Sequence, residues 1–302
     1  MKVLIKNPAP VDPADQVFWG DTFFGQGLAR CLEEQGCTTS TAFWEEWDQA
    51  AQADLLLVLR GTRAVGHLRG EFACKALWII SHPDAVEPEE LDQFDVIFCG
   101  SAAHTRALQA RGYEAHRLLQ CTDAEVFHIR GREPGKVDHD FIFVGNARDE
   151  RTLIHDAIAD GLALQLWGRG WERYGYEPYV AERFIPNAEL GRLYRRSFCG
   201  LNDHWSDMVS NQYVNNRVFD ALACGLPVLS DANDGLAELG FGGVIIRKPG
   251  RRFREVFDEL MAGYDQLLEA AARDSERIAS EHTFANRARE IIRICAQWTD
   301  GV

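Results

Sequence analysis

The chain of 302 residues is long enough for two domains, and its 46 % hydrophobic and 26 % charged residues are ordinary for a soluble globular protein. Its formal net charge of −14 argues against binding to nucleic acid or to an anionic membrane. No apolar run approaches the roughly 20 residues that span a bilayer, and the first residues are too few and too polar for a signal peptide. We therefore expect a cytoplasmic protein with no transmembrane segment. The eight scattered cysteines favour reduced, buried thiols over disulfides or a zinc site.

The first part of the chain alternates short apolar segments with helical ones. Strands are expected at Val3–Asn7, Thr38–Phe43, Asp54–Leu59, Ala76–Ser81, Phe94–Cys99 and Ala115–Leu119. Helices such as Thr22–Gln35 and Ala102–Gly112 separate them, with apolar positions recurring at intervals of three and four. Continuous apolar strands between helices are typical of a parallel sheet covered on both faces. This pattern predicts an α/β domain over residues 1–125.

Residues 120–139 interrupt the alternation with a polar connection around Pro134 and Gly135. A second alternation follows. Its strands are expected at Asp140–Gly145, Ala163–Trp167, Phe198–Asn202, Pro227–Ser230 and Val244–Arg247, and its helices at Asp149–Asp160, Ala188–Arg196, Asn216–Cys224, Phe253–Ser280 and Ala285–Trp298. We therefore expect a second Rossmann-like domain over residues 138–283, facing the first across a ligand-binding cleft. The helix within residues 284–302 is expected to pack back on the first domain.

The segment 215–231 carries the most informative functional pattern. Asparagines, including Asn216, are expected to cap a helix that ends at Gly225, which supplies a left-handed residue. Arg217 and Asp220 lie three residues apart, so they share the opening turns of one helical face. A fixed cation and a fixed carboxylate at a helix N-terminus suit a ligand that carries phosphate and vicinal hydroxyls. A capped helix with a surface ion pair explains the pattern equally well.

A glycine pair, Gly25 and Gly27, is expected just before the first long helix. Glycine lets a backbone approach a ligand closely, and the N–H groups of a helix start point at such a ligand. The segment is not a dinucleotide-binding fingerprint, because Arg30 stands where the third glycine would be. A tight turn that binds nothing is the alternative.

A second glycine turn follows the strand that ends at Gly145. It passes through Asn146 into an expected helix start that carries Arg148 and Arg151. Either arginine is suited to clamp a diphosphate that also receives the N–H groups of the helix. The alternative is an ion pair with a neighbouring acidic residue on the surface, which contributes little energy.

Two further turns contain aromatic or proline residues. Trp167 and Gly168 end a strand, where the indole either stacks on a base or sugar or simply fills a core. Ile185 and Pro186 lead into a helix for which Asn187 is the expected N-cap. The backbone of this last turn is placed to read a nucleobase edge.

His82 follows an expected strand at the sheet edge that faces the predicted cleft. A histidine there suits a general base or a partner for a sugar hydroxyl, and a loop histidine satisfied by Asp84 is the alternative. His104 and His204 have similar positions with weaker cases, and Asp231 is assigned to a turn or cap. Because no known metal-binding or phosphate-loop motif is present, we expect no metal and no cofactor.

Taken together, these segments resemble the glycosyltransferase group 1 superfamily with the GT-B fold, in the branch that includes spore-maturation-type glycosyltransferases. The resemblance covers about residues 140–232. It is carried by Val144-Gly145-Asn146, Leu166-Trp167-Gly168-Arg169-Gly170-Trp171, Ile185-Pro186-Asn187, Leu193-Tyr194, Leu201-Asn202 and the run from Asn216 to Gly225. It implies an α/β fold of two Rossmann-like domains. The second would bind a nucleotide-diphosphate sugar, and the first would bind the acceptor.

The resemblance also implies roles for single residues. Asp220 stands where the family has a glutamate that binds the ribose hydroxyls, and Gln212 stands where it often has a glutamate near the donor sugar. Arg217 and Arg148 match positions suited to the diphosphate, and His82 resembles a histidine that borders the donor sugar. His82, Arg217 and Gln212 are therefore the expected catalytic residues.

The expected activity is that of a retaining, metal-independent glycosyltransferase of the hexosyltransferase type in carbohydrate biosynthesis. It would take UDP in preference to GDP as the nucleotide of the donor, and its hydroxyl acceptor (a glycan, a protein or a small molecule) is open. Two alternatives stay open: a nucleotide-sugar epimerase, and a non-catalytic nucleotide-sugar-binding subunit of a glycosylation complex. Gln212 in place of a carboxylate favours the second.

Overall fold

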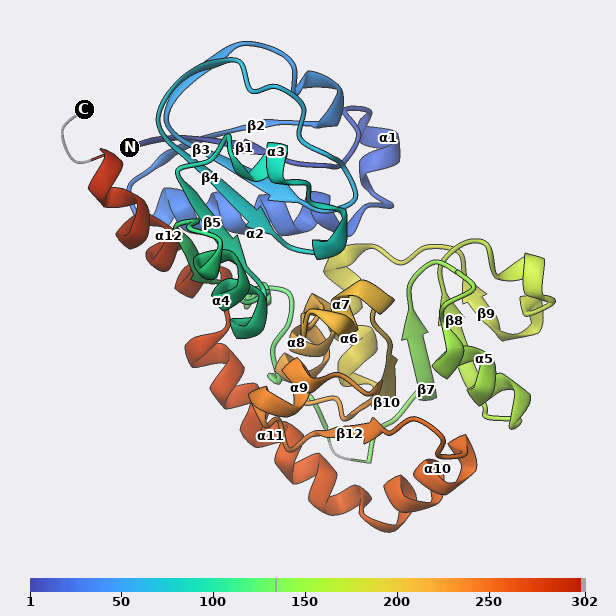
Figure 1. The fold of residues 1–302 in the computed structure, drawn as a ribbon. Coiled ribbons are helices and arrows are strands. Elements are labelled where there is room, and N and C mark those ends of the chain that lie inside the picture. The colour runs from blue at the N-terminus through green and yellow to red at the C-terminus, as the bar shows by residue number, and fades with distance from the viewer. Residues whose placement is uncertain (134, 300–302) are drawn as a thin grey trace. The chain divides into compact units, whose positions relative to one another are not determined.

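The computed structural model describes residues 1–133 and 135–299, which Figure 1 draws as a ribbon. The turn predicted at Pro134 and the last three residues of the predicted segment 284–302 lie outside these. The chain forms two compact units. The first contains Met1–Gln120, Ser210–Tyr213 and His282–Val302, and the second contains Cys121–Val209 and Val214–Glu281.

The first unit is built around a parallel six-stranded sheet with the strand order β2-β1-β3-β4-β5-β6. Its strands are β1 (Lys2–Lys6), β2 (Thr38–Ala42), β3 (Ala51–Arg60), β4 (Gly70–Ile79), β5 (Val96–Cys99) and β6 (Ala115–Arg117). Its helices are α1 (Pro13–Gln16), α2 (Gly20–Glu34), η1 (Trp44–Glu46), η2 (Pro83–Ala85), α3 (Pro88–Leu91), α4 (Ala102–Ala110) and α12 (Phe284–Thr299). β3 and β4 begin before their predicted starts, because exposed polar pairs such as Gln52 opposite Glu71 continue the ladder.

The core of the first unit joins both ends of the chain. Phe24 of α2 contacts Trp78 of β4 and Phe284 of α12, with ring centroids 5.1 and 4.8 Å apart. Trp78 is fully buried and donates its indole N–H to the Leu118 carbonyl at 3.0 Å. Burial of such rings dominates the energy of a core, so the last helix is an integral part of this unit.

The prediction that Gly25 and Gly27 stand in a turn before the helix is wrong. α2 begins at Gly20, so both glycines lie inside it. A Cβ atom at Gly25 would come within 2.2 Å of the Asn7 side-chain nitrogen, which donates to the Asp21 carbonyl at 2.7 Å. The missing side chain at Gly25 thus lets the loop after β1 pack against α2.

The second unit contains another parallel six-stranded sheet, with the order β12-β11-β10-β7-β8-β9 of a doubly wound fold. Its strands are β7 (His139–Val144), β8 (Leu164–Trp167), β9 (Val180–Glu182), β10 (Ser197–Asn202), β11 (Val228–Asp231) and β12 (Val244–Arg247). Its helices are α5 (Thr152–Ala159), η3 (Trp171–Tyr174), η4 (Glu177–Tyr179), α6 (Asn187–Arg195), α7 (Ser206–Ser210), α8 (Asn216–Ala223), α9 (Asp234–Leu239), α10 (Phe253–Ala262) and α11 (Tyr264–Glu281). The single helix predicted over 253–280 is two helices that meet at Gly263, and the short, mostly exposed strand β9 was not predicted.

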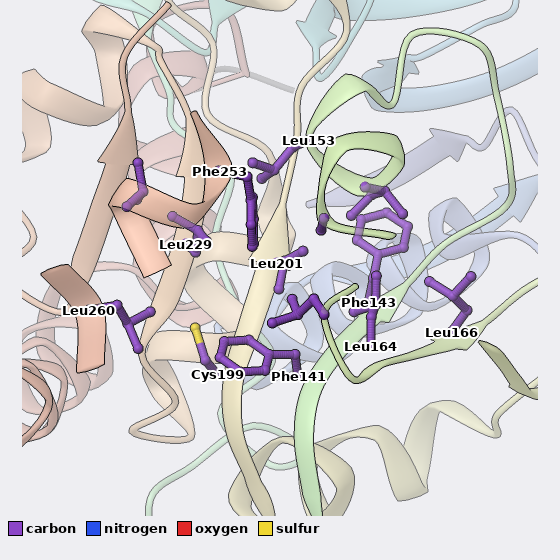
Figure 2. Packing of buried hydrophobic residues seen from close by; sticks show 14 of the residues in the cluster. Phe141, Phe143, Leu153, Leu164, Leu166, Cys199, Leu201, Leu229, Phe253 and Leu260 are labelled. Atoms are coloured by element: carbon purple, nitrogen blue, oxygen red, sulfur yellow. The ribbon is translucent and has the colours of Figure 1, made fainter. Parts of the chain in front are cut away.

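Apolar side chains of the strands and of α5 and α10 form the core of the second unit (Figure 2). Phe141 of β7 contacts the rings of Phe198 and Phe257 at 5.5 and 5.6 Å between centroids. Figure 2 labels further members of this cluster, which are Phe143, Leu153, Leu164, Leu166, Cys199, Leu201, Leu229, Phe253 and Leu260. This core fixes the positions of the strand ends that carry the candidate site.

α8 ends as the sequence predicts. Gly225 has a φ angle of +70°, and the Leu226 N–H donates to the Ala221 carbonyl at 3.0 Å, so a left-handed residue terminates the helix. The predicted reduced thiols are also confirmed, because all eight cysteines are free and all except Cys37 are buried. Within the described ranges, no helix is both long and apolar enough to span a membrane.

Candidate active site

The carboxyl ends of β7 and β10 lie next to each other at the centre of the second sheet. The strand order reverses at this point, since β8 follows β7 on one side and β11 follows β10 on the other. In doubly wound sheets, ligands bind outside the carboxyl ends of the strands at this reversal. The candidate site is therefore built from the loops after β7 and β10 and from the first turn of α8.

Two arginines from the loop after β7 contact one carboxylate after β10. Arg148 Nη2 lies 3.4 Å from Asp203 Oδ1 and donates to the His204 carbonyl at 2.7 Å. Arg151 Nη1 is hydrogen-bonded to the same Asp203 oxygen, and its Nε donates to the Asn146 carbonyl at 2.6 Å. Asp203 is buried, so a single negative charge faces two guanidinium groups.

Arg217, in the first turn of α8, is the third cation at this edge. Its Nε donates to the Val144 carbonyl and its Nη1 to Asn202 Oδ1, both at 3.0 Å. The guanidinium carbons of Arg217 and Arg151 lie 4.7 and 4.5 Å from the centroid of the same ring, Phe143. The structure thus brings the arginines of both predicted segments together. We call Arg148, Arg151 and Arg217 the arginine cluster.

The electrostatics of the arginine cluster favour an anion. Burial lowers the pKa of Arg151 to about 9, Asp203 opposes this shift, and the two neighbouring arginines add to it. Burial also lowers the pKa of Arg148. In a chain whose net charge is −14, this edge is a local excess of positive charge that a bound anion would relieve.

Four buried polar atoms beside the arginine cluster have no hydrogen-bond partner within the described part of the chain. They are Arg148 Nε, Asp203 Oδ2, His204 Nε2 and Asn215 Oδ1. Buried polar groups are normally paired with protein, water or ligand. Because the four include both donors and acceptors, they suit a polar ligand that carries anionic oxygens and hydroxyl groups.

The predicted capping role of the asparagines before α8 is wrong. Asn215 occupies the N-cap position, but its side chain makes no capping hydrogen bond and instead donates to the Asp203 carbonyl at 2.8 Å. Asn216 is the first helical residue, and its side chain donates to Asp220 Oδ2 at 3.2 Å. Both asparagines therefore organise the site rather than the helix end.

Asp220 is almost completely buried. Its Oδ1 accepts a hydrogen bond from Thr122 Oγ1 at 2.6 Å, while Oδ2 accepts the bond from Asn216. Burial raises the pKa of Asp220 from 3.8 to about 8, with smaller opposing effects of Thr122 and Arg217. Arg217 donates its hydrogen bonds to residues at the ends of β7 and β10 instead. Arg217 and Asp220, which were expected on one face of the helix, therefore have separate hydrogen-bond partners.

The predicted glycine turns after β7 and β8 pack on each other. A Cβ atom at Gly168, whose φ angle is +141°, would lie 2.2 Å from the Gly145 carbonyl oxygen. Asn146 Oδ1 accepts from the Arg169 N–H at 2.9 Å across the same contact. The close approach that Gly168 permits is thus to another loop, and it fixes the backbone from which Arg148 and Arg151 project.

The remaining predicted residues of the second unit have structural surroundings. Trp167 is buried at the end of β8, with its ring 5.4 Å from that of His139. Ile185 and Pro186 precede α6. Ile185 is partly exposed and Pro186 is exposed. The predicted N-cap is wrong by one residue, because Pro186 occupies the N-cap position and Asn187 starts the helix.

In the first unit, the segment 210–213 brings Gln212 into the unit that holds His82. Asn211 Nδ2 donates to Asp84 Oδ1 at 2.7 Å, and Tyr213 OH lies 2.8 Å from His104 Nδ1. Tyr213 is fully buried against Gly100, where an added Cβ would lie 2.6 Å from the tyrosine ring. The segment is therefore firmly seated.

His82 and Gln212, both predicted as catalytic, share an unusual backbone. Their φ angles are +53° and +62°, and in the described ranges no other residue except glycine has a positive φ. A left-handed conformation costs a non-glycine residue energy and recurs at functional sites. His82 Nδ1 lies 3.0 Å from Ser81 Oγ, which orients the imidazole.

Asp203 was not predicted as a site residue. His204 was given only a weak case, and Asp231 was assigned to a turn or cap. Asp231 Oδ2 accepts from the His204 backbone N–H at 2.8 Å, and Asp231 Oδ1 lies 2.6 Å from His204 Nδ1. The signal that could have found them is position, since Asp203 directly follows buried strand β10 and Asp231 ends β11.

Part of the sequence, most of it in the second unit, matches a known family. Residues 148–293 fit the family described as "Glycosyl transferase-like". This part of the chain is similar to that family. The match agrees with the predicted superfamily and with the predicted type of enzyme, a glycosyltransferase. No curated protein matches the sequence significantly.

Solved glycosyltransferase structures share the fold over the full chain. The sucrose-phosphate synthase of Thermosynechococcus elongatus superposes with a TM-score of 0.71 at 13 % identity, covering 100 % of each chain. A glycosyltransferase of Rickettsia africae ESF-5 gives 0.66 at 9 % identity, covering 100 % of this chain and 99 % of that one. Anabaena HepE in complex with UDP and glucose gives 0.63 at 11 % identity, covering 98 % and 99 %. The predicted α/β fold of the GT-B type, with two Rossmann-like sheets, is confirmed.

Proposed function

We propose that the glycosyl transferase-like chain moves a sugar from a nucleotide-diphosphate sugar to a hydroxyl acceptor. The observation that carries this proposal is the arginine cluster at the carboxyl ends of β7 and β10, with its unpaired buried atoms. Three guanidinium groups, of which only two pair with the Asp203 carboxylate, suit a diphosphate. The unpaired acceptor oxygens of Asp203 and Asn215 suit hydroxyl groups of the same ligand.

The proposed chemistry needs charge stabilisation above all. When the bond between the anomeric carbon and the diphosphate breaks, negative charge develops on the departing phosphate. Fixed cations aimed at that charge lower the barrier, because they need no reorganisation during the reaction. The arginine cluster would supply them without a metal ion. A retaining outcome and a cytoplasmic location belong to the same proposal.

UDP is the nucleotide that we favour over GDP. Anabaena HepE, which shares the fold, is described in complexes with UDP, with UDP and glucose, and with UDP-glucose. A hexose is therefore the first sugar to test. The acceptor would be a glycan, a protein or a small molecule, and the resemblance to the superfamily implies that the first unit binds it.

A second candidate function is a non-catalytic subunit that binds nucleotide sugars. Gln212 favours it, because an amide cannot act as the carboxylate that the superfamily often has near the donor sugar. Gln212 nevertheless has a left-handed backbone, with a φ angle of +62°, and such backbone recurs at functional sites.

Thermal-shift measurements with a panel of nucleotides test the proposal. UDP, GDP, UDP-glucose, UDP-N-acetylglucosamine and GDP-mannose are each added to the purified chain, and a bound ligand raises the melting temperature by mass action. We expect UDP and a UDP-sugar to give the largest shifts. Arg148→Gln should abolish them, whereas Arg254→Gln, which alters an exposed arginine paired with Asp258, should not.

Nuclear magnetic resonance of the anomeric signals then separates the candidate activities. Loss of the donor signal with slow hydrolysis or transfer supports a transferase. Conversion of the donor sugar in place identifies an epimerase, and binding with no turnover of any donor identifies a non-catalytic subunit. A chain that no nucleotide stabilises would overturn the proposal.

A further inference from the structure

Asp231 holds the loop after β10 at two points. Its carboxylate accepts from the His204 backbone N–H at 2.8 Å and contacts His204 Nδ1 at 2.6 Å. The His204 side chain is completely buried. Burial alone would raise the pKa of Asp231, but the hydrogen bonds from His204 hold that pKa below its usual range, so the carboxylate stays ionised.

The loop after β10, which Asp231 holds, also contacts Arg148. The His204 carbonyl accepts from Arg148 Nη2 at 2.7 Å, and the Trp205 ring lies 3.8 Å from the guanidinium carbon. Asp203 Oδ1 lies 3.4 Å from the same guanidinium. Three consecutive residues therefore determine where this cation sits, and the middle one is tied to Asp231.

A second set of hydrogen bonds runs from Asp231 to Arg217. Ser230 Oγ donates to Asp231 Oδ1 at 3.1 Å and accepts from Asn202 Nδ2 at 2.9 Å. Asn202 Oδ1 in turn accepts from Arg217 Nη1 at 3.0 Å. One hydroxyl proton and one amide satisfy this chain of bonds without conflict. Asp231 is thus linked by hydrogen bonds to residues that hold Arg148 and to residues that hold Arg217.

We propose that Asp231 and His204 are positioning residues, which hold Arg148 and Arg217 at the separation that a diphosphate requires. The inference rests on the proposed function, since it assigns the pair to the donor site. A misplacement of about 1 Å at such a site is expected to lower affinity and rate strongly. Neither residue needs to touch the donor for this effect.

Conservative and disruptive variants at position 204 provide the first test. Asparagine can place an amide N–H near the position of His204 Nδ1 and so keep the bond to Asp231, whereas leucine cannot. In calorimetric titrations with UDP, we expect His204→Asn to bind within about 3-fold of the unaltered chain and His204→Leu to bind about 10-fold more weakly, as for loss of one charge-assisted bond. Equal affinities of the two variants would overturn the proposal.

A double-mutant cycle tests whether Asp231 acts through Arg148. Asp231→Asn should weaken UDP binding about 10-fold by itself. Combined with Arg148→Gln, Asp231→Asn should weaken UDP binding clearly less than it does in the unaltered chain, because only Arg217 is left for Asp231 to position. Additive losses would overturn the role. Asp234→Asn, at an exposed position three residues away, is the matched control.

Inorganic pyrophosphate separates this inference from the proposed function. If the unaltered chain binds pyrophosphate in a manner that depends on Arg148 and Asp231 but binds no nucleotide, the positioning role stands and the proposed function fails. Asp231→Asn could instead lower the melting temperature while the affinities for pyrophosphate and UDP, measured at temperatures where the variant is folded, stay unchanged. In that case the residue is merely structural and the inference fails.

Discussion

Asn211 donates a hydrogen bond to Asp84 at 2.7 Å although 127 residues separate them in the chain. Asp84 lies two residues after His82, and Asn211 directly precedes Gln212. The bond therefore ties together the two segments that contain the left-handed, non-glycine residues of the described chain. A buried tyrosine on the other side of Gln212 secures the same segment. This relationship gives the first unit a candidate catalytic edge of its own.

Loss of the Asn211 bond should lower turnover without weakening the binding of UDP. Asn211→Ala removes one of the contacts that position the segment holding Gln212, while the arginine cluster in the second unit keeps its contacts. We expect a decrease of about 10-fold in kcat, as for loss of positioning in a bound complex, with the affinity for UDP unchanged. Tyr113→Phe, which removes an exposed hydrogen bond to Asp92 in the same unit, is the control. A parallel fall in UDP affinity would show that the segment acts otherwise.

The buried carboxyl of Asp220 should make stability depend on pH. Because the folded state raises its pKa from 3.8 to about 8, folding binds a proton between these pH values, so the stabilisation is lost progressively as the pH rises from about 4 to about 8. The melting temperature of Asp220→Asn, which is always neutral, should rise relative to that of the unaltered chain by at least about 2 °C between pH 5.5 and pH 9. Melting curves at both pH values check this, with Asp234→Asn as the control. The same difference at both values would place the ionisation elsewhere.

Asp220 also has a predicted role in binding the ribose. If its carboxyl serves the donor, Asp220→Ala should weaken the binding of UDP while the fold persists. Calorimetry with UDP and GDP measures this directly. Unchanged affinities would remove Asp220 from the site and leave it as a buried partner of Thr122.

The contact between Gly168 and Gly145 should tolerate no side chain. A Cβ at Gly168 would lie 2.2 Å from the Gly145 carbonyl oxygen, so Gly168→Ala must separate the two loops. We expect a loss of about 2–4 kcal/mol in the free energy of unfolding, together with weaker UDP binding. Gly175→Ala, at a φ angle of +72° with open space around the added Cβ, should cost only about 1 kcal/mol. Equal losses in denaturant titrations would contradict the steric account.

Much of the second unit could be predicted from local patterns. The apolar run before Gly145 and the helix stop at Gly225 are both readable in sequence, because strand burial and left-handed glycine leave distinct signatures. The arginines near these signals, Arg148 and Arg151 after Gly145 and Arg217 in the helix that ends before Gly225, were predicted from the same segments. Their partners were not, since Asp203 and Asp231 meet them only through the pairing of strands that lie far apart in the chain.

Two features of the first unit lacked any such signal. Trp19 precedes α2 without a capping side-chain bond, so no capping signal marks the start of the helix at Gly20. A helix was expected from Thr22, two residues later, but Gly25 within it was assigned to a turn. The segment 210–213 belongs to the first unit through the burial of Tyr213 and the bond to Asp84. Both contacts are tertiary, and local propensity does not report them.

The binding of UDP by Arg217 variants tests the central claim most directly. Calorimetric titration of the unaltered chain, Arg217→Gln and Arg217→Lys, each checked for a native circular dichroism spectrum, measures what the third cation contributes. We expect Arg217→Gln to weaken UDP binding at least about 10-fold. The affinity of Arg217→Lys should lie between those of Arg217→Gln and the unaltered chain, because lysine keeps the charge but lacks the forked donor of arginine. Arg254→Gln should bind normally. A folded Arg217→Gln that binds UDP as tightly as the unaltered chain would contradict the assignment of the arginine cluster as the donor site.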